Sequence, residues 1–237
     1  FLTRLPITLD CISQNEFGHG RTRNHAVSRT RGDYIVFLVQ DAEPVTGNWL
    51  QTLVETTERL SVAGAFGQQI PRPNASFFTK RQMENTLPDM SKSQVKVLDS
   101  GHDWYRLSPR QRYELTFFHD ANSCVSRDCM LDFPYLDVSY GEDLDWAKRV
   151  LLAGHGIAYV PDAKVIHSHD RSMLYDLKRA YADHSLAKQL FELTQFRSLS
   201  DMLRVWLWDT RQCAMAIRNL RRPIPEQAAL LVHAASH

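Results

Sequence analysis

Three sets of polar residues, far apart in the sequence, are of types that could do chemistry together. Asp41 directly follows an apolar run, Glu142 and Asp143 open a helical pattern, and His167 follows a short apolar run. A carboxylate and an imidazole can share a divalent cation, which can in turn bridge to a diphosphate. The acidic pair can supply a base that removes a proton from a hydroxyl group. Together they indicate group transfer from a diphosphate donor to an oxygen atom.

Each carboxylate also has a simpler structural explanation. Asp41 could merely start the turn Asp41-Ala42-Glu43-Pro44, because Asp and Pro favour turns. Glu142 and Asp143 could merely reflect the preference for acidic residues in a first helical turn, where the helix dipole stabilises them. For each residue alone both explanations stay open, and it is the ordered set that favours the chemical one.

Two histidines, His167 and His169, end a predicted strand. A single histidine is usually structural, and we expect these two to point to opposite faces, so that at most one faces a site. One imidazole and one carboxylate, completed by phosphate oxygens and water, suit Mn²⁺, with Mg²⁺ as the alternative. A zinc site would need more nitrogen or sulfur ligands than the sequence offers.

A basic turn near the start of the chain could bind phosphate. Residues 17–24 combine a glycine-containing turn, Arg21, Arg23 and the start of a helix that includes Asn24. Arginine can hold phosphate oxygens in a bidentate manner, and a helix N-terminus adds amide donors. The alternative is a solvated helix with ordinary surface arginines.

The elements that must position these groups alternate between strands and helices. Strands are expected at 6–12, 34–39, 62–70, 117–126, 156–160 and 163–167, and helices at 21–30, 47–60, 78–85 and 142–153. The run 34–39 is apolar without alternation, which is typical of a strand covered on both faces. The alternation predicts an α/β fold with right-handed crossovers. Residues 71–109 are expected to form a long, irregular excursion.

The C-terminal part of the chain has long helical patterns, at 173–193 and 199–220. Arginines recur there at every seventh position and so lie on roughly one stripe of a helix: Arg197, Arg204, Arg211 and Arg218. Segment 197–222 also contains Trp206 and Trp208, and it predicts contact with an anionic membrane surface. Alternatively, the tryptophans pack on the first domain and the arginines are solvated.

Composition limits the class of protein. A net charge of +1 over 237 residues gives no field that would favour nucleic acid. No stretch reaches the roughly 20 apolar residues of a membrane span. The four cysteines fall at no zinc-binding or CxxC spacing, which favours reduced thiols in the cytoplasm over a disulfide framework. Because the chain starts with Phe and ends in a helical pattern, we interpret it as a fragment of a longer protein.

The ordered motifs resemble family 2 glycosyltransferases of the GT-A fold, and most closely the bacterial rhamnosyltransferase branch. In that branch Gln-Asp-Ala, here residues 40–42, stands in place of the usual Asp-x-Asp. The resemblance extends over about residues 5 to 185. The motifs that carry it are residues 17–53, 67–73, 122–127, 141–149, 153–154, 159–163 and 167–169.

The resemblance implies an inverting transfer from a nucleotide-sugar, with a divalent cation, Mn²⁺ or Mg²⁺, on the diphosphate. It assigns Asp41 to the last Asp of the Asp-x-Asp motif and His167 to the histidine on the metal side. Asp143 takes the role of the catalytic base, with Glu142 beside it. The residues expected to contact the nucleotide-sugar are Arg21, Arg23, Asn24, Gln40 and Asp41.

Two departures from the family pattern qualify this interpretation. Val39 occupies the position of the first Asp of the motif, which predicts weaker or partial metal dependence. The opening strand and the nucleotide-base pocket, which the family places first, are absent. Residues 1–170 are therefore expected to form a GT-A-like mixed sheet without its first strands, and 171–237 a helical extension. A second hypothesis is a catalytically degenerate scaffold that serves as a binding or assembly subunit.

The first hypothesis is an enzyme of the cytoplasm, associated with the inner face of the cell membrane. It would pass a sugar, L-rhamnose from dTDP-rhamnose, to a hydroxyl of a glycan or lipid-linked acceptor in cell-surface polysaccharide synthesis, such as that of O-antigen. Contact with the membrane would be peripheral and would use residues 197–222.

Overall fold

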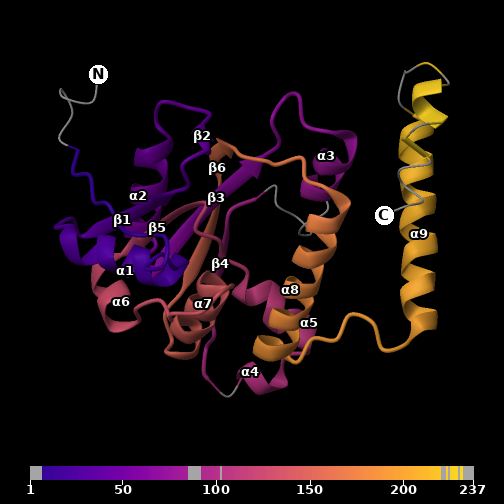
Figure 1. Ribbon diagram of the computed structural model, residues 1–237. Coiled ribbons are helices and arrows are strands. Elements are labelled where there is room, and N and C mark those ends of the chain that lie inside the picture. The colour runs from indigo at the N-terminus through magenta and orange to yellow at the C-terminus, as the bar shows by residue number, and fades with distance from the viewer. Residues whose placement is uncertain are drawn as a thin grey trace. The chain divides into compact units, whose positions relative to one another are not determined.

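A mixed β-sheet forms the centre of the first of two compact units, Phe1–Asp170 and Arg171–His237. The computed structural model describes residues 7–84, 92–101, 103–219, 223, 225–228 and 230–231. Figure 1 shows the strands of the first unit with helices around them. The predicted α/β class, with a mixed sheet flanked by helices, is confirmed.

The elements follow one another along the chain in the order shown in Figure 1. The strands are β1 (Tyr34–Leu38), β2 (Glu43–Pro44), β3 (Gly64–Ile70), β4 (Gln94–Lys96), β5 (Asn122–Ser126) and β6 (Ile157–Ile166). The helices of the first unit are α1 (His19–Arg29), α2 (Trp49–Arg59), α3 (Phe77–Glu84), α4 (Asp103–Arg106), α5 (Pro109–Thr116), α6 (Arg127–Asp132) and α7 (Glu142–Leu152). Those of the second unit are α8 (Met173–Phe191) and α9 (Leu199–Arg218).

The sheet has the strand order β1-β5-β3-β6-β2, and β4 pairs with β6 outside this path. Only the β3–β6 pairing is parallel among the described strands, and the other pairings are antiparallel. The long strands β3 and β6 therefore lie at the centre, and the ends of β1 and β6 carry the polar residues singled out in the sequence.

Side chains alternate across β3 and separate two apolar layers. Ala65 belongs to a buried cluster on the side of α2, which contributes Trp49 and Leu53. Phe66 points to the other side, where its ring packs 5.3 Å from that of Phe118. Trp146 of α7 lies 5.0 Å from the same Phe118 ring, so α7 covers this second layer. Both faces of the central strands are buried, as expected for strands beneath helices on either side.

The prediction of two short strands around Pro161-Asp162 was wrong, because β6 continues through both residues. The continuity is possible because β3 shifts register opposite this point: Gly67 pairs with Val160, and Gln69 pairs with Val165. The additional residues of β6 form an irregularity in the ladder, where a proline without an N–H group is tolerated.

Two other predicted strands differ from the structure. Residues 7–12 form no strand, and the side chains of Ile7, Leu9 and Ile12 are exposed. A strand is stable only with a neighbour that pairs with its backbone, and none pairs with 7–12 among the described residues. Of 117–126, only 122–126 is strand, because the five residues of β1 pair with these five alone.

The predicted helices at 21–30, 47–60, 78–85 and 142–153 are confirmed with shifted ends as α1, α2, α3 and α7. Residue 85 lies outside the described residues. Strand β4 and helices α4, α5 and α6 were not predicted. Local chemistry explains α5, which begins with a capping box between Ser108 and Gln111 and with Pro109 at its first position.

The second unit is helical, as predicted from the patterns at 173–193 and 199–220. Helix α8 begins at the cap of Ser172 and α9 at the cap of Ser198, each accepting a hydrogen bond from a backbone N–H. No helix among the described residues is long and apolar enough to cross a membrane.

Candidate active site

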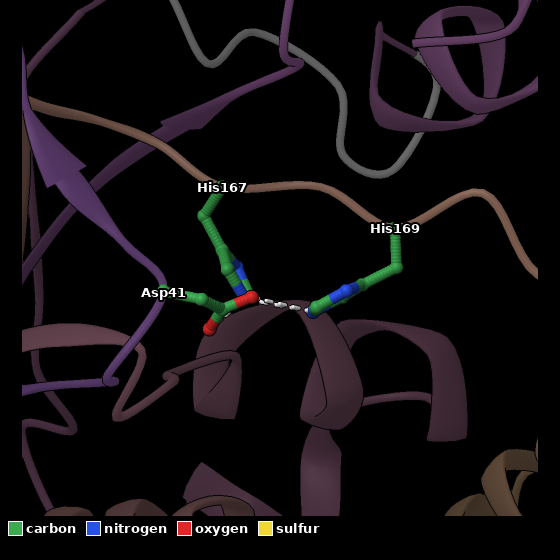
Figure 2. A group of neighbouring side chains, drawn as sticks. All are labelled: Asp41, His167 and His169. Atoms are coloured by element: carbon green, nitrogen blue, oxygen red, sulfur yellow. Dashed lines mark hydrogen bonds and ion pairs between the residues drawn. The ribbon is translucent and has the colours of Figure 1, made fainter.

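Asp41, His167 and His169 meet at one end of the sheet (Figure 2). His167 Nε2 lies 3.4 Å from Asp41 Oδ1, and His169 Nε2 lies 3.1 Å from Asp41 Oδ2. The two imidazoles also face each other, with their Nε2 atoms 3.2 Å apart. The predicted proximity of Asp41 and His167 is thus present in the fold, and a second histidine joins them.

The pairing of β2 with β6 explains why these residues meet. Glu43 of β2 is the partner of Ile166 at the end of β6. Asp41 precedes Glu43 by two residues, and His167 follows Ile166 directly. The ladder therefore places the turn after β1 beside the end of β6, although the two segments are far apart in the sequence.

The expectation that His167 and His169 point to opposite faces was wrong. In an extended chain neighbouring side chains alternate, so residues two apart lie on the same face. Ser168, between them, points the other way and accepts a hydrogen bond from the Arg72 backbone N–H at 3.0 Å. The Arg72 guanidinium in turn donates to the carbonyl oxygen of Asp41. The segment that carries both histidines is thereby tied to the turn that carries the carboxylate.

Gln69 of β3 fixes the orientation of the His167 ring. His167 Nδ1 lies 2.6 Å from Gln69 Oε1. Because an amide oxygen only accepts hydrogen bonds, Nδ1 must carry the hydrogen, and the Nε2 of the neutral ring then carries the lone pair. That lone pair is directed toward the Asp41 carboxylate, where a cation would be bound. An oxygen and imidazole nitrogens at this spacing fit a divalent transition-metal cation.

A second polar group lies at the start of α7. Glu142 is buried and accepts a hydrogen bond from the Arg23 guanidinium of α1. Arg23 Nε lies 3.5 Å from Asp120 Oδ2, and Asp120 is 2% exposed. Asp120 also accepts hydrogen bonds from the Tyr135 hydroxyl at 2.7 Å and the Ser123 hydroxyl at 3.1 Å. Arg23 therefore neutralises two buried carboxylates.

Asp143 follows Glu142 in α7 and stands next to this network. Its Oδ1 accepts a hydrogen bond from the Leu144 N–H at 2.8 Å. Burial, followed by the charges of Asp120 and Glu142, raises the pKa of Asp143 to about 7. Arg23 acts in the opposite direction but more weakly. A carboxyl group with this pKa can take up and release a proton near neutral pH, which is the property of a general base.

Residues 119 and 120 connect the two polar groups. Asp120 acts on the pKa of Asp143, and the adjacent His119 is close enough to His167 to be affected by it. Burial, as the larger cause, and His167 lower the pKa of His119 to about 4. Asp143 of α7 and the imidazole of His167 thus both interact with one short segment before β5.

The residues predicted to contact a donor fall into two classes. Asn24 is bound to the backbone of Tyr135, donating to its carbonyl at 2.8 Å and accepting from its N–H at 3.0 Å. Arg23 is held by the buried carboxylates. Arg21 is half-exposed, 3.8 Å from Asp137, and Gln40 is exposed in the turn before Asp41. Contact of these residues with a donor stays a prediction.

Three residues of this site were missed in the sequence: His169, Gln69 and Asp120. For His169 the signal was available, since a His-x-His spacing in an extended segment places both rings on one face. Gln69 and Asp120 belong to no recognisable pattern, because their roles depend on partners from distant elements.

Comparison with known proteins supports the family resemblance. The model of glycosyl transferase family 2 matches residues 7–132. Over 176 residues the chain is 28% identical to the O-antigen chain rhamnosyltransferase WbaN of Salmonella anatum, covering 72% of this chain and 52% of that protein. It is 26% identical to the O-antigen chain rhamnosyltransferase RfbN of Salmonella typhimurium, covering 74% and 54%. The chain thus spans about half the length of these curated relatives.

Among solved structures, the chain is similar to residues 1–349 of S. aureus TarS in complex with UDP-GlcNAc. That match has a TM-score of 0.49 and 13% sequence identity, and it covers 98% of this chain and 56% of that one. Because the family model matches more than half of its residues, the chain belongs to glycosyl transferase family 2.

Proposed function

We propose that the full-length protein transfers a sugar from a nucleotide-sugar to a hydroxyl acceptor in cell-surface polysaccharide synthesis, with inversion at the sugar carbon. The observation that carries this proposal is the pair of groups described above. A carboxylate and imidazoles gather where a diphosphate-bound cation could be held. A carboxyl group with a pKa of about 7 lies in the neighbouring network.

Asp143 is the proposed catalytic base. Its carboxylate takes the proton of the acceptor hydroxyl while the acceptor oxygen forms a bond to the anomeric carbon of the sugar. On the opposite side of that carbon, the bond to the diphosphate oxygen breaks, and the diphosphate leaves with the electron pair. A base with a pKa near the working pH serves this purpose, since it is ionised before the reaction and still basic enough to accept the proton.

Glu142 is proposed to position this base rather than to react. Its carboxylate is buried and bound by Arg23, so it is not free to accept a proton from a substrate. Its negative charge nevertheless raises the pKa of Asp143. Glu142 and Asp120 thus keep the neighbouring carboxyl group basic.

Asp41 and His167 are the proposed residues that hold the divalent cation, Mn²⁺ or Mg²⁺. When bound, the cation supplies positive charge that neutralises the charge developing on the departing diphosphate. Arg21 and Gln40, whose side chains are exposed, are the proposed polar contacts for the rest of the donor. Arg23 and Asn24 are proposed to support the donor site indirectly, because both already have partners inside the protein.

The proposed donor is dTDP-rhamnose, and the proposed acceptor is a glycan or lipid-linked sugar. The support is the similarity to two proteins named O-antigen chain rhamnosyltransferases. The test is incubation of the full-length enzyme with Mn²⁺, a lipid-linked glycan acceptor and dTDP-rhamnose, UDP-glucose or UDP-GlcNAc in separate reactions. We expect nucleotide release and product only with dTDP-rhamnose, and NMR of the product should show an inverted anomeric centre. Transfer from a UDP-sugar in preference would contradict the donor, and a retained configuration would contradict the mechanism.

The alternative of a degenerate, non-catalytic scaffold is favoured by Val39, which stands where the family has its first Asp. Calorimetric titration separates the two. An enzyme should bind dTDP-rhamnose with heat that depends on Mn²⁺, whereas a degenerate scaffold should give no metal-dependent heat.

Peripheral contact with the inner face of the cell membrane is proposed for segment 197–222. Leu199, Leu203 and Trp206 are exposed on α9, and their i, i+4, i+7 spacing places them on one face. Trp208, which is 62% exposed, lies about 200° around the helix from Trp206. The arginines of α9 supply the positive charge that an anionic leaflet would attract.

Flotation with anionic liposomes tests this contact. The wild-type protein should rise with the lipid, and the Leu203→Glu/Trp206→Glu variant should stay at the bottom of the gradient. Trp208→Ala is the control, because that side chain lies away from the proposed face. A wild-type protein that stays at the bottom would contradict membrane contact.

A further inference from the structure

We propose that His169 is a third protein ligand of the cation. It would take the place of the carboxylate that Val39 does not provide, and it would make the site prefer Mn²⁺ to Mg²⁺. This inference rests on the proposed function, since it concerns the same cation, but it assigns a residue and a selectivity to this chain in particular. Its support is the geometry of three side chains, Asp41, His167 and His169.

The distances between the donor atoms match those of ligands around one cation. A ligand atom lies about 2.1 Å from such a metal, so adjacent ligands are about 3.0 Å apart in an octahedron and about 3.4 Å apart in a tetrahedron. The separations here are 3.4 Å from His167 Nε2 to Asp41 Oδ1, 3.1 Å from His169 Nε2 to Asp41 Oδ2, and 3.2 Å between the two Nε2 atoms. The two imidazole nitrogens thus approach different oxygens of one carboxylate, and one ligand atom from each of the three residues lies within 4.8 Å of the others, a spacing that a single cation can bridge.

The surroundings of the three residues leave room for substrate ligands. His167 and Asp41 are partly buried, and His169 is exposed on one side. One face of the group is closed by Gln69, which holds the His167 ring. Because His169 is exposed, the group is accessible from solvent, and phosphate oxygens and water could complete the coordination.

His169 also compensates for the chemistry that Val39 lacks. A valine side chain has no donor atom, so the residue two positions before Asp41 cannot help to bind a cation. His169 brings a nitrogen to within 3.1 Å of Asp41 from a different segment of the chain. The exchange of an oxygen ligand for nitrogen changes both the charge and the softness of the site.

Two imidazoles and one carboxylate favour transition metals. Mg²⁺ prefers oxygen ligands and gives up its bound water reluctantly. Imidazole ligands suit Zn²⁺ and Fe²⁺ well, and Mn²⁺ accepts them more readily than Mg²⁺ does. The net charge of the ligand set is also only one negative charge, from Asp41, when both rings are neutral. A hard cation is therefore bound less strongly here than by a pair of carboxylates.

The experiment measures free Mn²⁺ by electron paramagnetic resonance as the protein is titrated with MnCl₂, in the presence and absence of dTDP. His169→Ala should weaken Mn²⁺ binding by at least about tenfold, the lower end of the effect of altering metal-site partners. His155→Ala is the matched control: it precedes the start of β6, about 30 Å along the strand from its end, and should bind Mn²⁺ as the wild type does.

A second variant tests the ligand role against a structural one. His169→Asp keeps a ligand but replaces nitrogen with oxygen, so it should bind Mn²⁺ while Mg²⁺ displaces the Mn²⁺ at lower concentration than in the wild type. A residue that only packs against Asp41 would not cause this shift in metal preference.

The inference is overturned if His169→Ala binds Mn²⁺ like the wild type, if His169→Asp behaves like His169→Ala, or if the wild type binds no Mn²⁺. The sugar-transfer assay tests the proposed function independently of these Mn²⁺-binding results. Transfer by an enzyme whose Mn²⁺ affinity does not depend on His169 would leave the function standing and remove this ligand. Mn²⁺ binding that depends on all three residues, without sugar transfer from any donor, would support His169 as a ligand and contradict the proposed function.

Discussion

Arg23 and Asp120 form an ion pair inside the protein, with Arg23 Nε 3.5 Å from Asp120 Oδ2. The same guanidinium binds Glu142, so a single arginine of α1 balances two carboxylates from separate parts of the chain. Glu142 opens α7, and Asp143 follows it. The position and ionisation of the proposed base therefore depend on a residue that is more than a hundred positions away in the sequence.

The first prediction concerns the removal of this arginine. Arg23→Met should lower the free energy of unfolding by about 3–5 kcal/mol, because it leaves the carboxylates of Glu142 and Asp120 buried without a counterion. Urea unfolding measures the loss. Arg21→Met is the control, because Arg21 is half-exposed and its pair with Asp137 is long, at 3.8 Å. Equal stability of the two variants would contradict the role of Arg23.

The second prediction concerns the catalytic base. Asp143→Asn in the full-length enzyme should lower turnover by about 10²–10⁴-fold, the contribution of a general base, and leave donor affinity nearly unchanged. Steady-state kinetics and calorimetric titration with the donor measure the two effects. Asp145→Asn is the control, because Asp145 lies in the same helical turn but pairs with Arg149 at 2.7 Å. Near-normal turnover of Asp143→Asn would rule out this base.

The third prediction is the dependence of activity on pH. Because burial and its acidic neighbours raise the pKa of Asp143 to about 7, the basic form is lost in mild acid. Turnover should therefore fall about tenfold for each pH unit below about 7, and level off above it. Arg23 lowers this pKa, so the midpoint should move to higher pH in Arg23→Met. A profile that stays flat down to about pH 5 would exclude Asp143 as the titrating group.

The same pKa predicts how stability changes with pH. An unfolded aspartate has a pKa of about 3.9, so the folded protein holds a proton on Asp143 that the unfolded chain has lost between about pH 4 and 7. The stability that Asp143 contributes is complete below about pH 4 and is lost as the pH rises through about 7. Asp143→Asn, which cannot ionise, should gain more stability over the wild type at pH 8 than at pH 5, as measured by urea unfolding. An equal gain at both pH values would contradict the raised pKa.

Much of the fold could be predicted from the sequence where local pattern and tertiary context agree. The apolar run of β1 and the amphipathic pattern of α7 gave elements of the right type, with ends shifted by a residue. Residues 7–12 have a strand-like pattern too, but no neighbouring strand pairs with them among the described residues. β-Propensity alone does not make a strand, because a strand is stable only when its backbone groups pair with those of a neighbouring strand.

The candidate site was predictable only in part. Asp41 and His167 could be associated because each follows an apolar strand, and such strands end at a common edge. The direction of His169 was predicted wrongly by a mistaken use of the two-residue period. Asp120 had no signal at all, because its role arises from Arg23 and Tyr135, which reach it from other elements.

The fifth prediction concerns Gly67, which lies where β3 shifts register against β6. A Cβ atom there would stand 2.0 Å from the carbonyl oxygen of Ala163 and 2.3 Å from Asn122 Nδ2. Asn122 donates to that same carbonyl at 2.7 Å and accepts from Trp49 Nε1 at 2.8 Å. An added methyl group would therefore separate two strands and break a buried hydrogen-bond network that joins them to α2.

Gly67→Ala should consequently lower the free energy of unfolding by about 3 kcal/mol or more, since the backbone carbonyl cannot move aside as a flexible side chain would. It should also weaken Mn²⁺ binding, because the register of β3 and β6 sets Gln69 beside His167. Gly47→Ala is the control, for a Cβ atom at Gly47 meets nothing within 4 Å. Urea unfolding and Mn²⁺ titration of the two variants measure both effects. Equal stability of Gly67→Ala and Gly47→Ala would contradict the close approach of β3 to β6 at this point.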